Sequence, residues 1–284
     1  MKLLRLKSVF SIVIAALFVL AACNNASKTK VKKGETTDGK SAYVDTEVFD
    51  VVKVKDQIVE IIQNSPSVDE ISELLNQSGA SYIFDLTVPF ENAEKFLTTT
   101  QQSLGLGLYA FDYQYANVYN RADVVTQIAQ IEAKMVDNLG LSAEIKSSEA
   151  YMERVRDNAD NADSINSLVI QAINFSHQQV AESDRPDVYA LAFIAANVEA
   201  MHVLAQLTLM AADNTELLKL IANQKERAQS VFALLEIMAA DKSVAPYYEQ
   251  MEPIMKYFDE ARRLGQKELE EVAPMIEKLR SSML

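Results

Sequence analysis

Two residues near the middle of the second half of the chain have the spacing of a metal-binding motif. Glu199 and His202 are three positions apart, so a helix places both on one face, as in the Glu-x-x-His motifs of di-iron bundles. Such a centre needs a second motif, but the only other histidine, His177, has Asn174 three positions before it. A zinc site of Glu199, His202 and His177 would require two helices packed antiparallel in register. We favour a hydrogen-bonded polar stripe inside a helical bundle and expect no metal site.

A second candidate site lies in a stretch rich in glycine and tyrosine. Gly105 and Gly107 each disfavour a helix interior by about 1 kcal/mol relative to alanine. The pair predicts either an interrupted helix or a second backbone that packs very close. Tyr109, Asp112 and Tyr113 follow, and they could line a ligand pocket that the glycines open. We favour the alternative, core aromatic residues whose hydroxyl groups find partners inside the protein.

The candidate ligand-binding residues are therefore Tyr109, Asp112, Tyr113, Glu199 and His202. Beyond them, the chain has no Cys-x-x-Cys-His haem attachment, no glycine-rich phosphate loop and no nucleophile elbow. Its serines, histidines and aspartates form no pattern that singles out a catalytic triad. We predict no catalytic residue and no cofactor, and we favour a protein that is not an enzyme.

The helix that must position Glu199 and His202 is the long apolar stretch of residues 186–212. A helix that is apolar on every face is either buried in a core or spans a membrane. At about 1.5 Å per residue, this one is long enough for either. We favour a buried helix, because Asn197, Glu199, His202 and Gln206 would be costly to place in hydrocarbon.

The rest of the chain after residue 45 also has helical periodicity, with glycine and proline mostly at the joints. It predicts an all-α fold of roughly eight to ten helices in a single domain, residues 43–284. The helices could form a multi-helix bundle or an irregular, solenoid-like array of hairpins. Residues 91–120 are expected to form one helical stretch, and Pro253 predicts a kink or the start of a new helix.

The first 22 residues have the form of an export signal. Lys2, Arg5 and Lys7 precede a short apolar run, and small residues follow. The signal ends in Leu-Ala-Ala-Cys, which resembles the lipobox of bacterial lipoproteins, with the only cysteine of the chain, Cys23, at the required position. The resemblance implies cleavage before Cys23 and attachment of acyl chains such as palmitate. At about 0.8 kcal/mol per buried methylene, two or three such chains bind a membrane firmly.

Residues 23–42 are polar and predict a flexible tether, since they have too few apolar groups to offset the entropy of ordering. Asn24 is not the aspartate that retains lipoproteins in the inner membrane, and no acidic run resembling a surface-export signal follows Cys23. We therefore expect the periplasmic face of the outer membrane.

The charge of the chain limits the classes of partner that it can bind. The net charge is −13, and residues 1–40 hold eight Lys or Arg against Glu35 and Asp38, so the remaining body is more acidic still. Such a body does not bind nucleic acid. The predicted partners are the membrane, through the lipid anchor, and either another envelope protein or a small ligand.

Several of these features together resemble uncharacterised all-helical lipoproteins of Bacteroidota. They are the lipobox and the stretches NSPSVDEISELLNQSGASY, LGLGLYAFDYQY, NLG at residues 138–140 and AFIAANVEAMHVLAQL. The resemblance implies an all-helical fold and an envelope location, and it supplies no activity.

The sequence thus favours a lipid-anchored, non-enzymatic helical module that binds a macromolecule or a small ligand. The alternative is a metal-dependent hydrolase or redox protein built on Glu199 and His202.

Replacing Cys23 by serine tests the anchor. Cys23→Ser should move the protein from the membrane fraction to the soluble periplasm, because the thiol that carries the lipid is gone. Fractionation in high salt followed by thermal unfolding measures both location and folding. A variant that still sediments with membranes would contradict the anchor.

Overall fold

The computed structural model describes residues 50–65, 69–140, 185–211, 214–260 and 265–284. The predicted signal peptide, Cys23, the tether and His177 lie outside these ranges. Within them the chain forms nine α-helices, two 3₁₀-helices and no strand. The prediction of an all-α, multi-helix bundle is confirmed.

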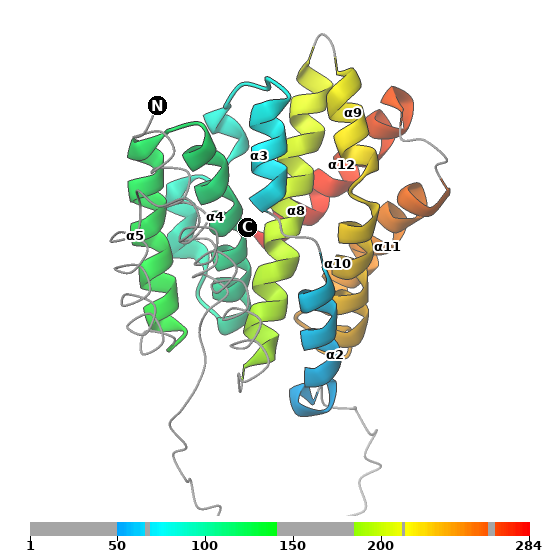
Figure 1. Ribbon diagram of the computed structural model, residues 1–284. Coiled ribbons are helices and arrows are strands. Elements are labelled where there is room, and N and C mark those ends of the chain that lie inside the picture. Colours follow the sequence, from blue (N-terminus) through cyan, green and yellow to red (C-terminus); the bar gives the residue numbers. More distant parts are fainter. Residues whose placement is uncertain (1–49, 66–68, 141–184, 212–213, 261–264) are drawn as a thin grey trace, which may run out of the picture.

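The helix at the centre of the fold is α8, Pro186–Met210, with its proline in the first turn, where a missing N–H is tolerated. Figure 1 shows α8 in the middle of the molecule, with α4 and α5 on one side and α9 to α12 on the other. The helices that pack against α8 are α4 (Thr99–Val118), α12 (Gln266–Met283), α10 (Lys225–Met238), α2 (Val51–Asn64), α9 (Thr215–Ala222) and α3 (Asp69–Gln77). Contacts around one central helix are typical of a bundle; in a solenoid each hairpin contacts only its neighbours.

Helix α8 is also, within the described ranges, the one helix long and apolar enough to cross a membrane. Of its 18-residue apolar window, 89% is buried inside the protein. The surrounding helices cover it, as the interpretation of a buried core helix requires.

Helices α4 and α8 touch backbone to backbone at Gly107. A Cβ atom on Gly107 would collide with the carbonyl oxygen of Ala192 on α8 and would lie 2.7 Å from its carbonyl carbon. A backbone carbonyl cannot rotate away as a side chain can, so this position excludes any larger residue. Of the two alternatives that the glycine pair predicts, the structure has the close backbone, at Gly107, and α4 continues unbroken through both glycines.

Gly105 allows neighbouring side chains to pack closely against the opposite side of the same helix. A Cβ atom there would lie 2.8 Å from Cδ2 of Phe96 and 3.0 Å from Cε of Met135, on α5 (Ala122–Asn138). Two positions turn a helix by about 200°, so the two glycines face nearly opposite directions. Helix α4 therefore lies closely between α5 and α8.

The expected helical stretch of residues 91–120 is divided in two. A 3₁₀-helix, η2 (Phe90–Lys95), comes first, and α4 begins only at Thr99. The division follows from a capping box. The Thr98 hydroxyl accepts the Gln101 amide at 3.2 Å, and the Gln101 side chain accepts the Thr98 amide at 3.1 Å.

Proline does not start a new helix at position 253. Helix α11, Ala245–Glu260, continues through Pro253, and α12 likewise continues through Pro274. A proline in a helix interior costs about 3 kcal/mol in lost hydrogen bonding and steric clash. Packing of α11 against both α10 and α12 offsets that cost.

The two glycines of α4 should respond differently to one added methyl group. Gly107→Ala should lower the free energy of unfolding by about 3 kcal/mol, at the upper end of overpacking costs, because the Ala192 carbonyl cannot yield. Gly105→Ala should cost less, since Phe96 and Met135 can shift and alanine favours helix by about 1 kcal/mol. Urea unfolding measures both. Equal losses would contradict the backbone contact at Gly107.

Candidate functional site

Three of the five residues predicted to form a site, Tyr109, Asp112 and Glu199, are linked to a segment that crosses the fold without α-helix. This crossover segment, residues 80–97, contains two 3₁₀-helices, η1 (Phe84–Leu86) and η2. Backbone N–H and C=O groups outside regular structure need other partners wherever they are buried. Helices α4 and α12 supply many of these partners through their side chains.

The first two partners are candidate residues of α4, Tyr109 and Asp112. The Tyr109 hydroxyl donates to the carbonyl oxygen of Pro89 at 2.9 Å. Asp112 Oδ2 accepts the amide of Val88 at 2.7 Å. Both side chains are fully buried, and the Tyr109 hydroxyl and Asp112 Oδ2 bond to the protein's own backbone.

The same face of the helix continues with two further tyrosines. The amide of Ile83 donates to the Tyr115 hydroxyl at 3.0 Å, and the Tyr119 hydroxyl donates to the carbonyl oxygen of Ala80 at 2.7 Å. As the position on α4 rises, the position of the partner falls, so the crossover segment runs antiparallel to α4. The favoured interpretation, core tyrosines with internal partners, agrees with this geometry.

Tyr113 lies apart from this face. The residue is 4% exposed, and burial, followed by the Glu132 carboxyl group of α5, raises the pKa of its hydroxyl. The structure therefore does not place Tyr113 with the other candidate residues.

The fully buried Glu199 carboxylate of α8 is held by an arginine of α12. Arg280 Nε donates to Glu199 Oε2 at 2.7 Å, and Nη2 donates to Oε1 at 2.8 Å, a bidentate ion pair. Arg280 Nη2 also donates to the carbonyl oxygen of Leu86 in the crossover segment, at 3.3 Å. The partner of Glu199 is therefore this arginine of another helix and not His202, one turn away on α8, because the arginine carries the opposite charge and offers two aligned donors.

Asp112 joins the same cluster. Burial, followed by the nearby Glu199 charge, raises the pKa of Asp112 well above its usual value. Burial alone would lower the pKa of Arg280, but Glu199 raises it, so the guanidinium stays charged. With one cation for two carboxyl groups, the neutral form is favoured at Asp112, and Glu199 carries the charge that pairs with Arg280.

His202 contacts the edge of the cluster. Its Nδ1 lies 2.8 Å from Oε2 of Glu277 on α12, a close polar contact that does not have the geometry of a hydrogen bond. Burial, followed by the Arg280 charge, lowers the pKa of His202 to about 3. The imidazole is therefore neutral at pH 7, and the contact is not an ion pair.

The cluster has little free capacity for a metal ion. Both carboxylate oxygens of Glu199 accept bonds from Arg280. In the part of the chain that the structure describes, no three His, Cys, Asp or Glu side chains lie where they could hold a metal. The alternative of a metal site on Glu199 and His202 gains no support from this geometry.

A further carboxyl group lies buried on α5. Glu132 is 0% exposed, and among the residues that the structure describes neither of its oxygens has a hydrogen-bond partner. It shares the buried face of α5 with Ile128, Met135 and Val136. Burial raises the pKa of Glu132 well above its usual value, which favours the neutral acid.

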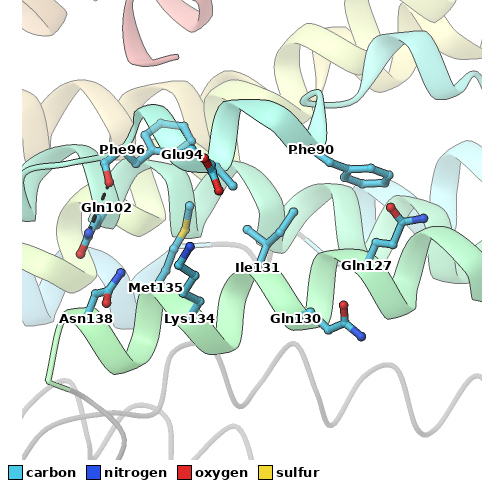
Figure 2. A pocket seen from close by; sticks show the side chains of 11 residues that line it. Phe90, Glu94, Phe96, Gln102, Gln127, Gln130, Ile131, Lys134, Met135 and Asn138 are labelled. Carbon is cyan, nitrogen blue, oxygen red and sulfur yellow. Dashed lines mark hydrogen bonds between the residues drawn. The ribbon is translucent and has the colours of Figure 1, made fainter.

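An open site lies elsewhere, between η2 and α5, where a pocket of about 280 Å³ reaches the surface (Figure 2). Its floor is apolar and its walls carry amide and charged groups. The lining residues are Phe90, Ala93, Glu94, Phe96, Gln102, Gln127, Gln130, Ile131, Lys134, Met135 and Asn138.

Comparison of the chain with models of protein families, with curated proteins and with solved structures gave no match. The site must therefore be judged from its own geometry, and the relation to Bacteroidota lipoproteins stays a prediction.

Arg280 and Glu132 were not predicted from the sequence, although both interrupt an apolar stripe. Arg280 follows Val272, Ile276 and Leu279 on the buried face of α12. A charged residue at such a position predicts either a buried partner or a neutralised group. The pocket left no comparable signal, because its two walls come from elements that only tertiary packing brings together.

Replacing Arg280 tests its role as the counter-charge of the buried Glu199 carboxylate. Arg280→Met should lower the free energy of unfolding at pH 7 by about 3 to 5 kcal/mol, because it leaves Glu199 buried without its counter-charge. The double variant Glu199→Leu with Arg280→Met should lose less than the sum of the two single changes. Urea unfolding measures the cycle. The exposed change Glu270→Ala, expected within about 0.5 kcal/mol of the parent, is the control. A loss at Arg280 no greater than this control would contradict the role.

The buried carboxyl group of Glu132 gives a pH-dependent prediction. In the unfolded chain Glu132 loses its proton near pH 4.3, whereas in the folded protein it keeps the proton to higher pH. The contribution of Glu132 to the free energy of unfolding therefore falls as the pH rises from the unfolded pKa through the folded pKa. Glu132→Gln removes that loss without changing the shape of the side chain. The variant should gain stability relative to the parent between pH 5 and pH 8, and urea unfolding at both values measures it. Asp112, Glu199 and His202 titrate in both proteins, so their effects cancel in the difference between the two free energies of unfolding. A pH-independent difference would contradict a neutral Glu132.

Proposed function

We propose that the chain is a lipid-anchored, non-enzymatic binding protein of the bacterial envelope, held at the periplasmic face of the outer membrane. The lipobox ending at Cys23 and the polar tether support the anchor and the location. The burial of α8 supports a protein body that stands outside the bilayer and depends on the lipid for attachment.

The observation that carries the binding role is the contrast between two groups of polar side chains. Around Arg280, the strong polar groups serve the crossover segment and one another. Around the η2–α5 pocket, the charged groups of Glu94 and Lys134 form no ion pair within the described residues. Polar groups that converge on an open pocket without internal partners are available to a ligand.

The pocket is also held in shape before any ligand arrives. The bond of Tyr109 to Pro89 fixes the backbone just before η2. The Phe96 carbonyl, just after η2, accepts Gln102 Nε2 at 3.3 Å. A wall fixed at both ends costs little further entropy when a ligand binds.

Filling the pocket tests this role without knowledge of the ligand. The full chain, purified from membranes in detergent, should unfold at a higher temperature when a low-molecular-weight extract of the envelope is added, because a ligand stabilises only the folded state. Ala93→Phe, which fills the pocket, should abolish the shift.

The matched control is Ala240→Phe, which adds the same ring at an exposed position outside the pocket. It should retain the full shift. An extract that stabilises neither protein, or Ala93→Phe as much as the parent, would contradict a binding role for this pocket.

A further inference from the structure

We propose that the η2–α5 pocket binds a short peptide with free termini, of two or three residues and with an apolar side chain. This proposal rests on the binding role proposed above and adds the chemical class of the ligand. Four properties of the lining carry it: the amides of α5, the opposed charges, the apolar floor and the size.

The α5 wall presents three carboxamides, from Gln127, Gln130 and Asn138. They recur at spacings of three and eight, which keeps them on one side of the helix. None has a hydrogen-bond partner within the described residues. A carboxamide donates and accepts at once, which makes it the side-chain complement of a peptide group with its own N–H and C=O.

Opposite charges come from the two walls. Figure 2 shows Glu94 extending from the η2 side and Lys134 from the α5 side, both toward the gap between them. They are further apart than an ion pair, so neither neutralises the other. A ligand with an ammonium group at one end and a carboxylate at the other would satisfy both charges.

The floor of the pocket is apolar, and two of its side chains pack against Gly105. Phe96 and Met135 form part of it, and they are the two side chains that a Cβ atom on Gly105 would displace. Phe90 and Ile131 extend the apolar surface (Figure 2). Such a floor accepts an aliphatic side chain and offers nothing to a ligand that is polar on every side.

The size limits the ligand to a small one. At about 280 Å³ the pocket lies just below the range of about 300 to 1,000 Å³ usual for small-molecule sites. A dipeptide or tripeptide fits such a volume, whereas a folded domain or a long chain does not.

Isothermal titration of the detergent-purified full chain with the dipeptide Ala-Leu tests the proposal. Ala-Leu should bind, and blocking both ends, as N-acetyl-Ala-Leu-amide, should weaken binding by about tenfold, since two exposed charge pairs of about fivefold or less each are lost. The uncharged disaccharide maltose should not bind. Equal binding of the free and blocked dipeptides, or binding of maltose alone, would overturn the proposal.

Variants assign each end of the peptide to a wall. Lys134→Gln should weaken Ala-Leu severalfold and leave Ala-Leu-amide unchanged. Glu94→Gln should weaken Ala-Leu and leave N-acetyl-Ala-Leu unchanged. The matched controls Lys242→Gln and Glu91→Gln remove the same charges outside the pocket and should bind as the parent does. Equal weakening of free and blocked peptides would overturn this assignment and the proposal with it.

Failure of the proposal is distinguishable from failure of the binding role. If the envelope extract stabilises the parent but not Ala93→Phe, while no peptide binds, the pocket is a binding site and the peptide class is wrong. If Ala93→Phe binds Ala-Leu as the parent does, the peptide binds outside this pocket, and the proposal is overturned.

Discussion

A segment that crosses an all-helical protein without forming an α-helix is the constraint on which the rest of the structure depends. The crossover segment cannot satisfy its own backbone groups as a helix does, and an unpaired buried peptide group costs about 1 to 3 kcal/mol. Tyr109, Asp112 and Arg280 meet this demand from two helices. The polar residues that look most like a catalytic cluster are therefore the ones that hold this segment in place.

The same constraint explains the composition of α4. One face of α4 carries tyrosines that are long enough to reach the crossover segment. On its other faces, the helix can lie close to its neighbours only at residues without a side chain, which are glycines. Gly107 provides this toward α8, and Gly105 provides it toward Phe96 and α5. The helix propensity lost at the two glycines is repaid by close packing on both sides.

Charge is divided between the interior and the surface in an unusual way. Asp112, Glu132 and Glu199 are all fully buried, and Arg280 is the cation that faces two of them. Burial is tolerable because one carboxylate is paired and neutral forms are favoured at the others. The pocket keeps its opposite charges, Glu94 and Lys134, at the surface, where a ligand can reach them.

The sequence by itself determined the features that depend on local periodicity and on residue size. The 3.6-residue period predicted the all-α fold, and the polar residues within the apolar stretch of residues 186–212 favoured a buried helix over a membrane span. The glycine pair predicted either an interrupted helix or a close backbone, and the structure has the close backbone. Tertiary structure alone decided which residues meet. The Glu199–Arg280 pair joins residues 81 positions apart, and the pocket joins η2 to α5. Periodicity shows which face of a helix is buried, but the neighbour that covers this face depends on the packing of the whole chain, which no local pattern encodes.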